Sequence, residues 1–214
     1  MRLIFIRHGE TAWSPEGRYQ GISDTALSPA GIEKLRPAGP LLRARLPGLA
    51  EPEFVCVSGL LRTRQTADIL FPGVPQIVLP GLREMDFGVF EGKNYRELEE
   101  NPSYRAWVEG GCLGTCPGGE SKAGFCVRVL RTFEELMECF AGEKTLILVV
   151  HGGTIMALLE RFGQPERPYF DWHLPCGHAY LLKASDWRKE KILRLEGSLD
   201  FTGEAWGGRQ QGWI

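Results

Sequence analysis

The sequence lacks the features that would point to a membrane protein or a nucleic-acid-binding protein. Its longest apolar run, Leu146 to Val150, is far shorter than the roughly 20 residues that cross a bilayer. No apolar segment after Met1 is long enough for a signal-peptide core, so we expect a cytoplasmic protein with no membrane partner. The chain has 25 basic and 27 acidic residues and a formal net charge of −2, and this balance gives no reason to expect a nucleic-acid partner.

The chain also lacks a recognisable metal-binding pattern. None of its six cysteines forms a C-x-x-C pair. Cys112 and Cys116 are four residues apart in a Gly-rich segment without a neighbouring histidine, which is a poor match to a zinc site. Free thiols in a reducing compartment explain the cysteines better. We therefore expect neither a metal nor another cofactor.

The pattern that is present is an alternation of short apolar runs with helical segments, which is typical of an α/β fold. With 214 residues, of which 43% are hydrophobic and 24% charged, the chain fits one domain over residues 1–214 with a cap-like insertion at about 81–125. Pro37 and Pro40 must kink or divide the first long helix. The expected strands are 2–6, 54–57, 77–79, 144–150, 179–183 and 192–195; the expected helices are 29–45, 60–70, 95–108, 121–140 and 154–161.

Polar and basic residues follow three of these strands, at the edge of an α/β sheet where ligands bind. Arginine gives planar paired donors to phosphate oxygens, and helix N-termini add free N–H groups. Each group alone has an ordinary structural explanation, but their agreement at one edge predicts a phosphoryl site. The three groups are Arg7-His8-Gly9, then Ser58-Gly59 with Arg62 and Arg64, and His151-Gly152-Gly153.

Five segments, in order, resemble the conserved blocks of the histidine phosphatase superfamily, which includes phosphoglycerate mutases and cobalamin-pathway phosphatases. The resemblance implies a phosphoglycerate mutase-like three-layer α/β/α sandwich with a mostly parallel sheet and a small cap. Within the family the chain looks most like the alpha-ribazole phosphatase branch. The segments are RHGETAWSPEGRYQGISDTALSPAGI, SGLLRTRQTA, LREMDFGVFEGKNYREL, CPGGES and VVHGGTIMALL.

The resemblance also implies roles for five residues. His8 is expected to attack phosphorus and form a phosphohistidine that water later hydrolyses. Arg7, Arg62 and His151 are expected to bind the non-bridging oxygens. Glu84 matches the family's acid, which protonates the leaving oxygen; Asp86 is its rival within the same segment. Because arginines and histidines supply the electrostatic stabilisation, no metal is called for.

A second group of residues is expected to border the phosphate or the body of the substrate. Ser14 stands where many relatives have asparagine, so an amide contact to phosphate is lost or replaced by a hydroxyl. His173 and His178 are interpreted as packed structural histidines. The bordering residues are Ser14, Arg18, Gln20, Gly21 and Gly152.

Three functions remain open at this point: a phosphomonoesterase acting on a small phosphorylated metabolite such as alpha-ribazole 5′-phosphate, a phosphoglycerate mutase, and a non-catalytic phosphate-ester-binding protein. The phosphatase is favoured because the chain lacks the mutase-type block after the acid, and because a binder needs no acid. Aromatic residues of the cap and of the Ser14–Gly21 loop are expected to form a surface for a flat leaving group. These residues are Tyr19, Phe87, Phe90, Tyr95 and Trp107.

The oligomeric state also remains open. Trp206, Trp213 and Ile214 lie in a polar, Gly-rich C-terminal segment. They could pack on the domain, cover a second copy or stay free of contacts, so a homodimer is one of the alternatives.

Overall fold

A seven-stranded sheet with the order β3-β2-β4-β1-β6-β7-β5 forms the centre of the computed structural model. The structure describes residues 1–45, 52–140, 145–185 and 187–200. β1 pairs in parallel with β4, β4 with β2, and β2 with β3, whereas β6 runs antiparallel to both β1 and β7. The strands are β1 (Arg2–Arg7), β2 (Val55–Val57), β3 (Gln76–Val78), β4 (Thr145–Val150), β5 (Gly163–Gln164), β6 (His178–Lys183) and β7 (Leu193–Asp200).

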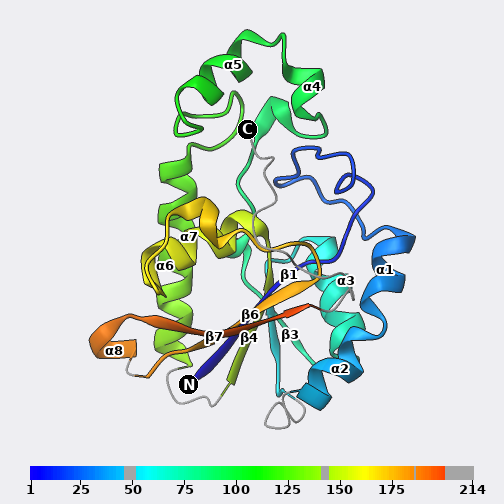
Figure 1. Cartoon of the computed structure of the whole chain (residues 1–214), viewed down its shortest axis with the longest axis vertical. Helices are drawn as coiled ribbons and strands as arrows, with labels where there is room; N and C mark the ends of the chain where they lie inside the picture. The colour runs from blue at the N-terminus through cyan, green and yellow to red at the C-terminus, as the bar shows by residue number, and fades with distance from the viewer. Residues whose placement is uncertain (46–51, 141–144, 186, 201–214) are drawn as a thin grey trace.

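Helices cover both faces of this sheet, so the predicted mostly parallel α/β/α sandwich is confirmed (Figure 1). One layer holds α1 (Pro29–Leu35), α2 (Ala38–Arg45) and α3 (Leu61–Leu70), and the other holds α6 (Lys122–Cys139) and α7 (Gly152–Phe162). Successive side chains of a strand point to opposite faces. Accordingly, Leu3 and Phe5 belong to the core with α6 and α7, and Ile4 and Ile6 to the core with α1 to α3.

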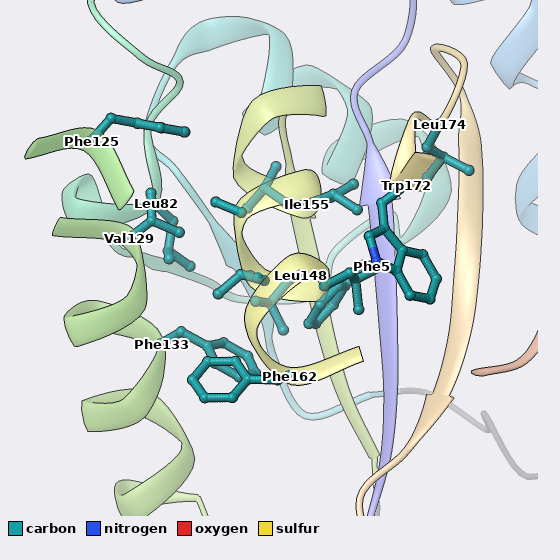
Figure 2. Close-up of a cluster of buried hydrophobic side chains, with 14 of the residues drawn as sticks. Phe5, Leu82, Phe125, Val129, Phe133, Leu148, Ile155, Phe162, Trp172 and Leu174 are labelled. Carbon is teal, nitrogen blue, oxygen red and sulfur yellow. The ribbon is translucent and has the colours of Figure 1, made fainter. Parts of the chain in front are cut away.

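Aromatic and aliphatic side chains together fill the core between the sheet, α6 and α7 (Figure 2). The ring of Phe133 on α6 meets Phe5 of β1 edge to face at 5.7 Å and lies 5.9 Å from Phe162 of α7. All three side chains are almost fully buried. This packing fixes α7, and with it the turn that joins β4 to α7, against the end of the central strands.

Proline divides two helices that the sequence pattern presents as continuous. α1 ends at Leu35 and α2 begins at Ala38, so Pro37 separates them, as the sequence predicted. The single helix expected at 95–108 is wrong, because the structure has α4 (Tyr95–Leu98) and α5 (Pro102–Glu109) instead. Asn101 accepts from the N–H groups of Ser103 and Tyr104 and caps a new helix, whose first turn holds Pro102.

The segment between β3 and α6 carries α4 and α5 and lies beyond the carboxyl end of β1 (Figure 1). Two of the five aromatic side chains expected to form a stacking surface, Phe90 and Trp107, are buried instead, so the expectation is wrong for these two. Trp107 is 7% exposed and Phe90 is fully buried, while Tyr19 lies 5.1 Å from Phe87 and 5.9 Å from Trp107 between ring centroids. Burying these rings gives the small cap a core of its own.

The last part of the sheet is longer than the sequence pattern predicted. β7 continues to Asp200, five residues beyond the expected end, and pairs with β6 along its length. The remaining short elements are η1 (Pro80–Leu82), η2 (Gly88–Phe90), η3 (Tyr169–Trp172) and α8 (Trp187–Glu190). Trp206, Trp213 and Ile214 lie outside the described residues, so their role stays a prediction.

Candidate active site

The parallel pairing brings the ends of three strands together. Arg7 of β1 lies opposite Val150 of β4, and Val57 of β2 lies opposite Val149. The next residue of each strand therefore reaches the same edge of the sheet, which places His8, Ser58 and His151 side by side. The His8 and His151 rings lie 5.2 Å apart between centroids.

His8 is buried, with 5% of its surface exposed. Its ring Nδ1 lies 2.8 Å from the carbonyl oxygen of Gly9. A carbonyl oxygen only accepts, so Nδ1 carries the proton and Nε2 keeps a free lone pair. Burial, and then the positive charges of Arg62 and Arg7, hold the pKa of His8 well below its usual value. His8 is therefore a neutral imidazole with a free Nε2.

Arg7 is held from the segment that precedes β6. Its Nη1 donates to the carbonyl oxygen of Leu174 at 2.7 Å and lies 3.2 Å from Nε2 of His173. Burial, and then the charge of Arg7, lower the pKa of His173 to about 4, so its neutral ring accepts from the arginine. An ideal Cβ on Gly152 would lie 3.3 Å from the Arg7 guanidinium carbon. A side chain at position 152 would therefore press on this arginine.

Arg62 extends from the first turn of α3 and is fully buried. Its two terminal nitrogens donate to the carbonyl oxygens of Ser23 and Gly21 at 2.8 and 2.7 Å. Burial lowers the pKa of Arg62 to about 10, although the charge of Glu84 opposes that shift. The guanidinium therefore stays positively charged at neutral pH.

His151 ends β4 and forms the N-cap of α7. Its Nε2 lies 2.7 Å from the hydroxyl oxygen of Ser58. Burial, followed by the charges of Arg62, His8 and Arg7, lowers its pKa. Among the described residues, Nδ1 of His151 is one of the buried side-chain nitrogens without a hydrogen-bond partner, and the Nε atoms of Arg7 and Arg62 are two others. Unpaired buried polar atoms of this kind are uncommon in proteins.

Glu84 reaches the same group from the loop after η1. Its carboxylate accepts from the N–H of Gly153 at 2.8 Å and from that of Met85 at 3.0 Å. Burial raises the pKa of Glu84, although these two bonds and the charges of Arg62 and Arg7 lower it in part. Its rival Asp86 accepts from the N–H of Gly88 in a local turn. The geometry thus favours Glu84 as the carboxyl group of the site.

The residues expected to border the substrate are held by neighbouring protein groups. Arg18 pairs with Glu16 and with Glu97 of α4, each at 2.6 Å, so both neighbours compete with a ligand for its charge. The hydroxyl of Ser14 accepts from the N–H of Thr11 at 3.0 Å. Gln20 accepts from the Thr11 hydroxyl at 2.9 Å, the carbonyl of Gly21 accepts from Arg62, and Gly152 lies against the Arg7 guanidinium.

Two residues in contact with the site were missed by the sequence analysis. His173, interpreted there as structural, contacts Arg7, and the hydroxyl of Tyr169 donates to the carbonyl oxygen of Gly153 at 3.3 Å. Both precede β6: His173 reaches Arg7 because β6 lies beside β1, and Tyr169 reaches Gly153 because η3 packs on α7. His178 pairs with Asp200 across the β6–β7 ladder at 3.2 Å, in agreement with a structural histidine.

Within the described residues, no three histidine, cysteine or acidic side chains are grouped as metal ligands would be. All six cysteines are free thiols. In the same part of the chain, no helix is both long enough and apolar enough to span a bilayer.

Comparison with known proteins shows the family to which this site belongs. Residues 3–194 match the model of the histidine phosphatase superfamily, branch 1, and the chain belongs to that superfamily. The adenosylcobalamin/alpha-ribazole phosphatase of Salmonella typhimurium LT2 is 36% identical over 165 residues, which cover 75% of this chain and 79% of that protein. The protein named Probable phosphoglycerate mutase GpmB from Enterobacter sp. strain 638 is 36% identical over 71% of this chain and 70% of its own.

The fold comparison agrees with the sequence comparison. The crystal structure of the alpha-ribazole phosphatase from Shigella flexneri superposes with a TM-score of 0.78 and 25% identity, covering 97% of this chain and 100% of that one. The chain is thus a phosphatase of the histidine phosphatase superfamily, in its alpha-ribazole phosphatase-like branch.

Proposed function

We propose that this phosphatase is a metal-independent phosphomonoesterase that acts through a phosphohistidine at His8. The observation that carries the proposal is the bond between Nδ1 of His8 and the Gly9 carbonyl at 2.8 Å, because it leaves Nε2 unprotonated for attack. The buried carboxyl group of Glu84, with its raised pKa, supplies the acid that such a reaction needs on the other side of the phosphoryl group.

The reaction then proceeds in two displacements. In the first, Nε2 of His8 forms a bond to phosphorus, the ester P–O bond breaks, and the proton of Glu84 goes to the leaving oxygen. In the second, water attacks phosphorus, its proton returns to Glu84, and the N–P bond breaks to release phosphate. Arg7, Arg62 and His151 bind the non-bridging oxygens in both steps. Phosphate oxygens would also give partners to their three unpaired buried nitrogens.

As substrate we propose a small phosphorylated metabolite, and specifically alpha-ribazole 5′-phosphate. The names of the Salmonella and Shigella relatives support this choice. Because Phe90 and Trp107 are buried, they cannot stack on a substrate. Tyr19 and Phe87, which are half-buried, and Tyr95, which is exposed, still can. A cytoplasmic location, one domain over residues 1–214, a homodimer, and independence of cofactors and of nucleic acid remain predictions.

Trapping of the intermediate tests the chemistry. Wild-type enzyme mixed with labelled 4-nitrophenyl phosphate and quenched within a turnover is expected to carry an acid-labile, base-stable label on His8, and His8→Ala is expected to carry none. Glu84→Gln is the matched variant: nitrophenolate leaves without help, but hydrolysis of the adduct loses its base, so the label should accumulate. A turnover-competent enzyme without any labelled histidine would refute the mechanism.

Substrate comparison tests the metabolite. We expect kcat/KM for alpha-ribazole 5′-phosphate to exceed that for 3-phosphoglycerate by about tenfold or more, which corresponds to about 1.4 kcal/mol of transition-state binding. The alternative, favoured by the GpmB relative, is a mutase. It would be supported if 3-phosphoglycerate isomerises faster than it is hydrolysed. A protein that binds both esters without turnover would instead be a non-catalytic binder.

A further inference from the structure

Arg128 of α6 directs its whole guanidinium group at the segment that carries Glu84. Its Nη1 donates to the carbonyl oxygens of Gly81 and Arg83, both at 3.0 Å, and its Nη2 donates to the carbonyl oxygen of Glu84 at 3.2 Å. Nε and Nη2 also form a fork onto the two carboxylate oxygens of Glu120, at 2.8 and 2.6 Å. An arginine has five N–H donors, so each one has a partner here.

Glu120, in the CPGGES segment, binds the same stretch of main chain as Arg128. The proposed chemistry gives this segment no role. One carboxylate oxygen of Glu120 accepts from the N–H of Asp86 at 3.0 Å, and its own N–H donates to the Asp86 carbonyl at 2.8 Å. Glu120 therefore binds both the main chain after Glu84 and the arginine that binds the main chain before it. The Arg128–Glu120 pair lies largely out of solvent, with 27% of each side chain exposed.

The α7 side of the same segment is fixed as well. The hydroxyl of Thr154 donates to the carbonyl of Leu82 at 3.2 Å, and the N–H of Gly153 binds the Glu84 carboxylate at 2.8 Å. The main chain on either side of the acid is thus held by Arg128 and Glu120 and by α7, while the carboxyl group is held by the N–H of Gly153 in α7 and by the N–H of Met85.

We propose that Arg128 and Glu120 form a positioning pair that sets the place of the Glu84 carboxyl group relative to the leaving oxygen. The inference rests on the proposed function, because it assigns the pair to the acid of that reaction. Neither residue needs to touch the substrate. Lysine cannot replace Arg128, because it has three donors on one nitrogen and cannot bridge a carboxylate and three carbonyl groups at once.

The test uses two aromatic esters that differ in how much they need an acid, namely benzyl phosphate and 4-nitrophenyl phosphate. In Arg128→Lys we expect kcat/KM for benzyl phosphate to fall about tenfold or more, and for 4-nitrophenyl phosphate by less than about threefold, because a displaced acid slows only the ester with the poor leaving group. Glu120→Gln keeps an oxygen for the Asp86 N–H. It should therefore lower kcat/KM for benzyl phosphate relative to that for 4-nitrophenyl phosphate, but by less than Arg128→Lys does.

Arg131→Ala is the matched control. Arg131 lies three residues further along α6, pairs only with Glu135 among the bonds seen in the described chain, at 2.9 Å, and is 80% exposed. We expect it to leave both rates unchanged. Equal losses on the two esters in Arg128→Lys and in Glu120→Gln would show a general structural role and overturn the inference.

Glu84→Gln, measured alongside, separates this inference from the proposed function. If Glu84→Gln slows benzyl phosphate selectively and the Arg128 and Glu120 variants do not, only the positioning pair is wrong. If Glu84→Gln lowers kcat/KM, which reports the first displacement, equally for both esters, the acid assignment is wrong and the pair loses its role with it.

Discussion

Substitution of Gly153 tests where the carboxyl group of Glu84 lies. Gly153 is the second residue of α7, and its N–H donates to the Glu84 carboxylate at 2.8 Å. A Cβ built on Gly153 would lie 2.2 Å from Oε1 of Glu84 and 3.2 Å from the Tyr169 hydroxyl. Gly153→Ala therefore places a methyl group where the acid now sits.

The local backbone does not oppose this substitution. In a helix, alanine is more favourable than glycine by about 0.5–1 kcal/mol, so the penalty comes from the contact with Glu84. A carboxyl group at the end of a side chain can rotate away, but it then gives up its bonds to the N–H groups of Gly153 and Met85. We therefore expect a folded enzyme whose acid is out of place.

The expected loss follows from what a general acid contributes, about 10²–10⁴-fold in rate. For Gly153→Ala we expect kcat/KM for benzyl phosphate to fall about 10²-fold, or about 2.7 kcal/mol in activation free energy, and for 4-nitrophenyl phosphate by less than about threefold. Gly124→Ala is the control, because Gly124 lies in the first turn of α6 and its Cβ would meet only the Ser121 hydroxyl, at 3.4 Å.

Thermal unfolding and both esters should be measured for each variant. If Gly153→Ala keeps wild-type kcat/KM for benzyl phosphate with an intact fold, then Glu84 does not act from the position seen here. If both esters lose activity together while Tm falls, the methyl group has disturbed the edge of the sheet and the argument about the acid fails.

Three further predictions concern metals, the cap and pH. Prolonged chelation should leave kcat/KM unchanged, and Mg²⁺, Mn²⁺ or Zn²⁺ should not raise it several-fold; a strict metal requirement would contradict the proposed role of the arginines. Trp107→Ala should lower the free energy of unfolding, measured in urea titrations, by about 3–5 kcal/mol, because Trp107 is only 7% exposed. Tyr95→Ala should lower it far less, because Tyr95 is 54% exposed. Equal effects of the two substitutions would contradict a hydrophobic core in the cap. Burial, and then nearby positive charges, lower the pKa values of His8 and His151 in the folded state, so below about pH 6.5 the unfolded chain binds more protons and stability falls as pH falls. His151→Asn should make the free energy of unfolding fall less steeply as pH falls. An unchanged slope would contradict the lowered pKa of His151.

The central strands and the strand-end residues could be predicted because their signals are local. β4 is an apolar run rich in β-branched residues, and β1 ends on Arg7, directly before His8. Once the strands are parallel, their carboxyl ends must meet, so no distant contact had to be inferred. The division between α4 and α5 was also signalled locally, by Asn101-Pro102, but the helical pattern on either side obscured it.

What could not be predicted depends on contacts between distant segments. Tyr19 reaches the rings of Phe87 and Trp107 across the cap, so a sequence rich in aromatics there predicts either a binding surface or a core. His173 meets Arg7 only because β6 lies beside β1. In both cases the residue type was visible in the sequence but its partner was not.

Burial accounts for the opposite shifts of the two groups proposed to react. Removing water disfavours the charged form of either group, so the same environment lowers the pKa of His8 and raises that of Glu84. Both shifts favour the states that the first displacement needs, an imidazole without its second proton and a carboxyl group with one. Arg62 is the exception. Burial lowers its pKa only to about 10, so the guanidinium stays positively charged at neutral pH. The sheet edge therefore shifts the nucleophile and the acid toward their neutral forms while the arginine stays charged, and this difference follows from the unperturbed pKa values of the three side chains.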